Sequence, residues 1–180
     1  GYFQKVRVQA PTFPWFWGML HFDDGSYLDW FMPHISFSSL NLNDKPWKLR
    51  DIFRNPKIGT GIFHDAKRNT TEEFKKCTVE LIEPDKNDEL LLDNDGNPLP
   101  KFRIRVWNEN TQIALEVRAV SRAKWTFDQP TRAGMVSHLT YNEYPLQVLK
   151  IAIKDEEGLR TKNDYSWIHG NAEHSWGFLH

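Results

Sequence analysis

The stretch that decides the fold is WFWGMLHFDDGSYLDWFM, residues 15–32. Two apolar runs flank an Asp-Gly pair, which is a strong signal for a tight β-hairpin. If Asp24 and Gly25 form a two-residue loop, Leu20 pairs with Asp29. Both faces of this hairpin are apolar, whereas an antiparallel strand at the surface usually has one polar face. We therefore expect the hairpin to be covered on both sides.

This register predicts which side chains share a face of the hairpin. One face would carry Trp15, Trp17, Met19, His21, Leu28, Trp30, Met32 and His34. The other would carry Phe16, Gly18, Leu20, Phe22, Tyr27, Asp29 and Phe31. A glycine within a strand, here Gly18, indicates a bulge or a close approach of the backbone.

The rest of the chain is also dominated by alternation with a period of two, which indicates antiparallel strands with one wet face. Further strands are predicted at Phe3–Gln9, Phe74–Ile82, Phe102–Trp107, Ile113–Val120 and Leu146–Ile153. Turns are predicted at Asn94–Pro98, Asn108–Thr111 and Asp155–Gly158, and one short helix at Pro46–Asn55. Closely spaced strands in 180 residues indicate one all-β domain, residues 1–180, folded as an antiparallel barrel of eight to ten strands or as a sandwich. A barrel of this size can enclose one small ligand.

Composition excludes several classes of function. The net charge is −1 and the cations form no long run, which argues against a nucleic-acid surface. No apolar run reaches the length of a membrane span. Cys77 is the only cysteine, so no intramolecular disulfide forms, and a reducing compartment such as the cytoplasm is favoured. The seven histidines lack the spacing of a metal site, and we expect neither a metal nor a cofactor.

Asp29 is the first candidate catalytic residue, because it lies among apolar neighbours. Desolvation favours the neutral form of a carboxyl and raises its pKa. A neutral carboxyl in an apolar setting can act as a general acid on an apolar substrate. The alternative is that Asp29 caps a bulge or pairs with an arginine such as Arg7 or Arg50.

The last sixteen residues, YSWIHGNAEHSWGFLH, are too aromatic for a solvated tail and too polar for an ordinary core strand. Strict alternation places Glu173 and His174 on opposite sides of a strand unless a bulge turns one of them. They are either an acid–base pair or buried hydrogen-bonding groups that close the barrel. Aromatic and histidine side chains would form the ligand-binding wall: Trp15, Trp17, Trp30, His34, Trp167, His169 and Trp176.

Two segments together resemble a known family. They are Trp15–Phe31 and the stretch Gly170–Gly177, which contains Glu-His-Ser-Trp-Gly. The chain resembles the lipocalin-like (calycin) superfamily of carotenoid 1,2-hydratases, also called hydroxyneurosporene synthases, and their Diels–Alderase-type relatives. The resemblance implies a barrel that binds a long apolar or terpenoid molecule. Typical members carry two barrels, so this chain would be a single barrel or one half of such a protein. By motif, Asp29, Glu173 and His174 are the positions to test.

Three functions remain open at this point. The first is a binding module for a hydrophobic, isoprenoid or lipid-like molecule held by aromatic side chains. The second is a cofactor-free hydratase or cyclase in which a carboxyl protonates an alkene and aromatic faces stabilise the cation. The third is an interaction domain, with a second barrel or a second copy of the chain packed on the first hairpin.

Overall fold

The structure, a computed structural model, describes residues 15–33, 59–83, 90–130, 134 and 136–179. These residues form an almost entirely β protein whose strands all pair antiparallel. In chain order the strands are β1 (Trp15–Phe22), β2 (Tyr27–Pro33), β3 (Thr60–Asp65), β4 (Thr70–Phe74), β5 (Cys77–Ile82), β6 (Lys101–Trp107), β7 (Gln112–Ala119), β8 (Ala123–Pro130), β9 (Val136–Asp155), β10 (Gly158–Thr161) and β11 (Ile168–Leu179). A 3-10 helix, η3 (Lys162–Asp164), connects β10 to β11.

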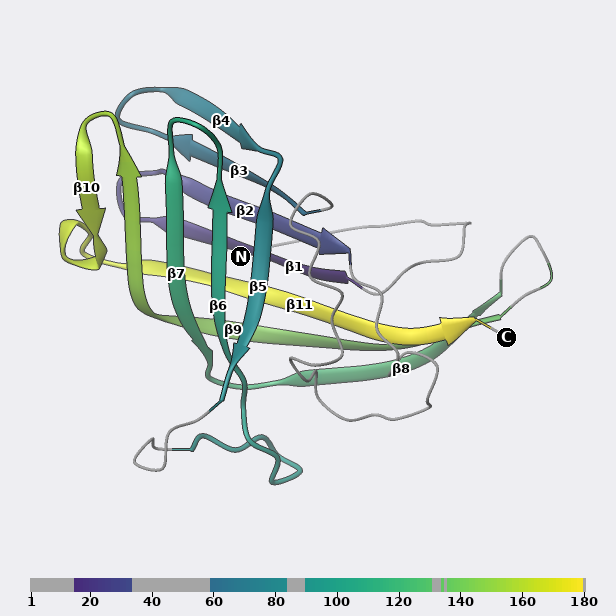
Figure 1. The fold of residues 1–180 in the computed structure, drawn as a ribbon. Coiled ribbons are helices and arrows are strands. Elements are labelled where there is room, and N and C mark those ends of the chain that lie inside the picture. Colours follow the sequence, from purple (N-terminus) through teal and green to yellow (C-terminus); the bar gives the residue numbers. More distant parts are fainter. Residues whose placement is uncertain (1–14, 34–58, 84–89, 131–133, 135, 180) are drawn as a thin grey trace.

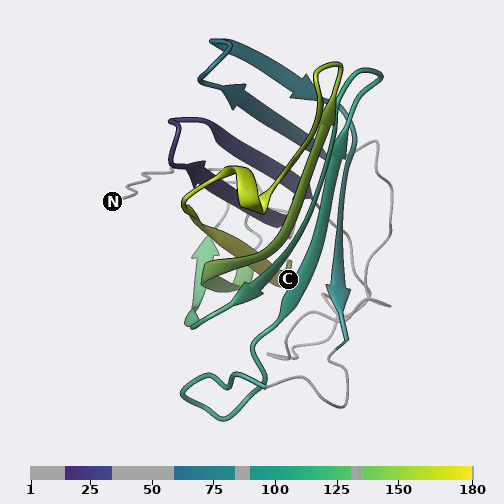
Figure 2. The same ribbon diagram turned by 90° about the vertical axis from the view of Figure 1, so that its left-hand side faces the viewer.

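Nine of these strands form one curved sheet in the order β4-β3-β2-β1-β11-β9-β7-β6-β5. Figure 2 shows its two halves facing each other across the interior, with β10 and η3 at the near end. The sheet nearly closes where β5 approaches β2. The predicted antiparallel barrel of eight to ten strands, consistent with a lipocalin-like barrel, is confirmed. The predicted elements at Phe3–Gln9 and Pro46–Asn55 lie outside the described residues.

Strand β9 organises the sheet because each of its edges pairs with two strands. β11 and β10 share one edge, and β8 and β7 share the other. β8 and the adjoining ends of β9 and β11 extend beyond the barrel (Figure 1). Pro145 lies where the partner changes from β8 to β7, and its carbonyl accepts from the Val120 amide at 3.0 Å. The N–H that a proline lacks would point to this same edge of β9, between the end of the β8 pairing and the start of the β7 pairing. No strand hydrogen bond is lost there, so a proline is tolerated within β9.

Two sequence-based strand predictions had the wrong limits. The segment Phe74–Ile82 is not one strand, since Lys75 and Lys76 separate β4 from β5. The strand predicted at Leu146–Ile153 is only the second half of β9. The polar first half of β9 gives no apolar alternation because it belongs to the part of the sheet that extends beyond the barrel.

The hairpin of β1 and β2 forms, but its register differs from the predicted one by a single residue. Leu20 pairs with Leu28, and Met19 pairs with Asp29. The Phe22 amide donates to the Ser26 carbonyl at 2.9 Å, so the connection is a three-residue turn, residues 23–25, in which Gly25 has a φ of 90°. A shift of one residue moves every side chain of one strand to the other face of the sheet. The predicted face assignments of β2 are therefore wrong.

In the observed register, Leu28, Trp30 and Met32 point inward with Phe16 and Leu20. The rings of Phe16 on β1 and Phe102 on β6 meet across the barrel with centroids 4.8 Å apart. Trp30 lies over Gly18, where a Cβ would come within 2.2 Å of its ring. Side chains therefore fill the barrel interior at this level, and Gly18 makes room for the Trp30 side chain rather than marking a bulge or a close backbone approach.

Buried ion pairs lie near the two ends of the barrel. Close to the turns of β3 and β9, Arg160 contacts Asp65 at 2.7 Å and Asp155 at 2.8 Å, and Arg68 contacts the same two carboxylates. The other pair is Arg122 with Asp93, at 2.8 Å, with both side chains almost fully buried. Sequence reasoning did not identify either group, because their members are far apart along the chain.

Candidate functional site

Aromatic side chains and carboxyl groups lie together on the outward side of β1, β2, β9 and β11. Alternation along β1 directs Trp15 and Trp17 away from the barrel interior. Trp17 is paired with Phe31 of β2 on one side and with Glu173 of β11 on the other. We call this region the Trp–carboxyl face, and it comprises Trp15, Trp17, Asp29, Tyr141 and Glu173.

Asp29 lies on this face beside an indole. The Trp17 Nε1 donates a hydrogen bond to Asp29 Oδ2 at 3.2 Å. Burial raises the pKa of Asp29, and the hydrogen bond from Trp17 offsets part of that rise. The raised pKa agrees with the sequence analysis, but the residue paired across from Asp29 is Met19 rather than the expected Leu20. Among the described residues no arginine or lysine forms an ion pair with Asp29; Arg7 and Arg50 lie outside them.

Glu173 is the more enclosed of the two carboxyls, with only 5% of its surface exposed. Burial and the neighbouring Glu143 carboxylate raise its pKa, whereas hydrogen bonds from Tyr141 and Trp15 oppose that rise. The rings of Trp15 and Tyr141 lie 6.2 Å apart. Glu173 is therefore a carboxyl held between aromatic side chains, with its pKa above the ordinary range.

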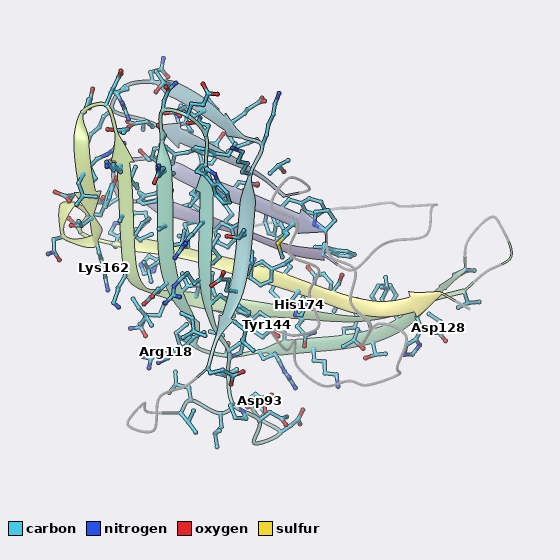
Figure 3. All side chains as sticks on the ribbon, in the orientation of Figure 1. Asp93, Arg118, Asp128, Tyr144, Lys162 and His174 are labelled. Carbon is cyan, nitrogen blue, oxygen red and sulfur yellow. The ribbon has the colours of Figure 1, made fainter. Side chains whose placement is uncertain are left out.

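His174 points to the opposite side of the sheet from Glu173. It is buried in the barrel interior, with its ring 6.0 Å from that of Phe16 (Figure 3). The Asn142 side-chain amide donates to the His174 carbonyl at 3.2 Å. β11 runs in continuous register with β1 and β9, so no bulge turns one side chain toward the other. Glu173 and His174 therefore do not form an acid–base pair.

The predicted ligand-binding wall is not a single surface, and this expectation is corrected. Trp30 is fully buried on the inward face, opposite to Trp15 and Trp17, because of the changed register. Trp167 and His169 stack on each other with centroids 5.3 Å apart. His169 is four strand positions from Glu173, a separation of about 14 Å.

Two members of that predicted wall cannot be placed. His34 lies outside the described residues. The backbone of Trp176 pairs with Thr140, but its side chain is outside the description.

Sequence reasoning missed Tyr141 and Glu143, which complete the surroundings of Glu173. Glu143 pairs directly with Glu173 and accepts a hydrogen bond from the Asn171 side chain at 2.9 Å. The signal was present in YNEY, residues 141–144, whose alternation places Tyr141 and Glu143 on one face. This alternation indicates that Tyr141 and Glu143 lie beside Glu173 only when the pairing of β9 with β11 is known.

Other kinds of site find no support among the described residues. No cluster of three metal-ligating side chains occurs in the described ranges. The same part of the chain contains no helix with the length and hydropathy needed to cross a membrane. Cys77 is buried, and burial raises the pKa of its thiol to about 12, as expected for a packing role.

Comparisons with known proteins do not identify a relative. No family model matches the chain, and neither the curated proteins nor the solved structures contain a significant match. The resemblance to the carotenoid 1,2-hydratase superfamily therefore stays a prediction from the sequence motifs.

Proposed function

We propose that this chain binds an apolar small molecule, isoprenoid or lipid-like, against the Trp–carboxyl face. The observation that carries the proposal is the position of Trp17, a partly exposed indole hydrogen-bonded to Asp29 and paired across the sheet with Glu173. Covering about 100 Å² of apolar surface would contribute about 2.5 kcal/mol. The indole supplies that surface at the centre of the face.

The two carboxyls would orient the ligand. Asp29 and Glu173 lie on strands either side of β1, opposite Met19 and Trp17, so two interstrand spacings and two strand residues separate their backbones, about 12 Å in all. A neutral carboxyl can both donate and accept a hydrogen bond. The burial that raises the pKa of Asp29 and Glu173 also disfavours a further negative charge beside them, which favours a ligand with a neutral polar group, such as a hydroxyl or carbonyl, on an apolar body.

The outward face suits a ligand better than the centre of the barrel. Phe16, Trp30 and Phe102 occupy the interior around Gly18 and are almost fully buried. On the outward face, Phe31 is 40% exposed beside Trp17. An apolar ligand would cover this exposed ring as well as the indole.

Retinol, a neutral polyene alcohol, is a suitable probe, because energy transfer from tryptophan reports its binding. Trp17→Ala should weaken retinol binding by more than tenfold, since it removes about 2.5 kcal/mol of contact. Trp107→Ala on β6, in the opposite wall, is the matched control and should change the affinity less than twofold. Equal affinities for the Trp17→Ala variant and the wild type would contradict the proposal.

A catalytic function is the second candidate, favoured by two carboxyls with raised pKa values beside indoles. In a hydration, the protonated carboxyl gives its proton to one alkene carbon, and the cation forms on the other. Water then adds its oxygen to that carbon and returns a proton to the carboxylate. The net reaction adds one water molecule, and the indole face would stabilise the cation.

Incubating geranylgeraniol in water enriched in heavy oxygen tests this reaction by mass spectrometry. Asp29→Asn should abolish the labelled alcohol if Asp29 is the acid, and Glu173→Gln should do so if Glu173 is. Retinol affinity should change little in either variant. A wild-type protein that gives no labelled product would leave binding alone as the proposed function.

The same face is the candidate contact for a second barrel or a second copy of the chain. Phe31 and Ile62 are both exposed there, next to Trp17 and Asp29 respectively. If two copies pack on this face, light scattering should show a dimer that Phe31→Asp dissociates. A monomer at high concentration would rule out the homodimer.

A further inference from the structure

The opposite wall of the barrel gathers cations that are scattered in the sequence. Arg103 and Arg105 project outward from β6, Lys150 from β9, and Lys162 belongs to η3. β5, β6 and β7 cross in front of β1, β2 and β11, so the outward side of this wall is turned toward the viewer (Figure 1). The net charge of the whole chain is only −1, and the concentration of positive charge arises from strand pairing.

These cations line a surface depression with a volume of about 540 Å³. Ala114 of β7 and Ala152 of β9 are directly paired within it. The neighbouring pair, Glu116 and Lys150, has much longer side chains. Two adjacent methyl groups beside a row of long side chains produce a hollow with an apolar floor, and η3 forms a wall at one end.

A β-bulge shapes the same depression. Glu116 pairs with Lys150 and Val117 pairs with Val148, so Leu149 is the extra residue on β9. Bulges re-aim side chains and are over-represented beside functional sites. Leu149 lines the depression. The Lys162 ammonium donates to the Val148 carbonyl at 2.8 Å, which fixes this cation next to the bulge.

The charge of the depression is only partly compensated. Glu116 contacts Arg103 at 2.7 Å and Lys150 at 3.1 Å, and hydrogen bonds from Arg103 and Lys150 lower its pKa. Arg105 and Lys162 have no carboxylate partner among the described residues. Four cations and one carboxylate in the lining leave a net charge of +3.

We propose that this depression binds a small phosphomonoester, with its phosphate between Arg105 and Lys162 and its apolar part on Ala114, Leu149 and Ala152. A phosphomonoester carries a charge of about −1.5 to −2 at neutral pH, which suits two cations that lack a carboxylate partner better than a monocarboxylate does. The planar guanidinium of Arg105 matches phosphate oxygens in a two-point hydrogen bond. A compact hollow with a wall fits a small molecule, whereas a polynucleotide would require a continuous basic groove.

Phenyl phosphate is the probe, and amide chemical shifts of the isotope-labelled full chain are the readout. We expect a saturable titration in which the amides around Ala114 and Ala152 shift, while phenol causes no comparable change. Arg105→Gln should weaken binding at least about tenfold, the equivalent of one charged hydrogen bond. Lys162→Gln should weaken binding by a similar factor, and this variant provides the test if Arg105→Gln does not fold.

Arg118→Gln is the matched control, because Arg118 lies on the same outward face but outside the depression, bonded to Gln147 at 2.6 Å (Figure 3). It should change the affinity less than about twofold. Equal losses from the Arg105 and Arg118 variants would show a diffuse basic surface and overturn the proposal. A titration without saturation, or benzoate binding as tightly as phenyl phosphate, would also overturn the proposal. The same holds if a single-stranded oligonucleotide binds more tightly than phenyl phosphate with a steep salt dependence.

Discussion

Gly18→Ala is the sharpest test of how the barrel is packed. A Cβ at this position would lie 2.2 Å from Trp30 Cζ2, 2.7 Å from Cε2 and 2.8 Å from Cη2. Carbon atoms in ordinary contact are about 3.5–4.0 Å apart, so the indole or the strand must move by more than about 1 Å. Trp30 is fully buried and stacks on Phe16, so a movement of its indole disturbs other core side chains. We expect a cost of about 3 kcal/mol in the free energy of unfolding.

For a chain of this length, that cost corresponds to a fall of about 6–12 °C in Tm, measured by circular dichroism. The reasoning also predicts coupling, since Gly18→Ala should cost less than about 1 kcal/mol when Trp30 is already Leu. Gly96→Ala is the control, because its Cβ would meet no atom within 4 Å and its cost arises only from a φ of 79°. That cost should be the same in both backgrounds. An equal penalty for Gly18→Ala with and without the Trp30 indole would refute the reasoning.

Three further predictions concern buried polar groups. Because the folded protein raises the pKa of Glu173, the native state binds more protons than the unfolded state between the two pKa values, and stability falls as pH rises through that window. Glu173→Gln removes this loss and should therefore gain stability relative to wild type in urea titrations as pH rises above the ordinary range of a glutamate. Burial raises the pKa of Asp65, but hydrogen bonds from Arg160 and Arg68 outweigh it and lower the pKa overall. The ionised Asp65 therefore stabilises the fold above its unfolded pKa, and this contribution is lost as pH falls through the folded pKa. Asp65→Asn should cost about 2 kcal/mol at pH 7 and flatten the fall in stability at acid pH. Cys77, with its pKa raised to about 12 by burial, should resist iodoacetamide in the native protein and react once urea unfolds it, and rapid native labelling would contradict its packed position.

Local patterns were sufficient for much of the fold. The alternation of Phe102–Trp107 and Ile113–Val120 predicted strands that β6 and β7 confirm within a residue. Turn residues at Asn94–Pro98, Asn108–Thr111 and Asp155–Gly158 separate elements as expected. These predictions succeeded because a strand with one buried face alternates apolar and polar residues, and this alternation is visible in the sequence.

The candidate site was predictable only in part. Asp29 was identified from its apolar neighbours and Glu173 from its place beside His174 in the aromatic C-terminal segment, and the folded protein raises the pKa of both carboxyls. The prediction was wrong about which side chains lie beside them. A difference between a two-residue and a three-residue turn changed the register by one position, which moved Trp30 away from Trp17 and brought Asp29 to it. Both faces of this hairpin are apolar, so the sequence offered no polar face with which to choose between the two registers.

The sequence alone determined an antiparallel all-β chain and the positions of most turns, because these depend on backbone preferences and on alternation between neighbouring residues. Only the tertiary structure decided which strands pair. It thereby decided that β9 joins β11 to β7, that Glu143 adjoins Glu173, and that Arg105 and Lys162 border one depression. Such proximities result from burying apolar surface throughout the whole barrel at once, and residues far apart in the chain carry no local record of that packing.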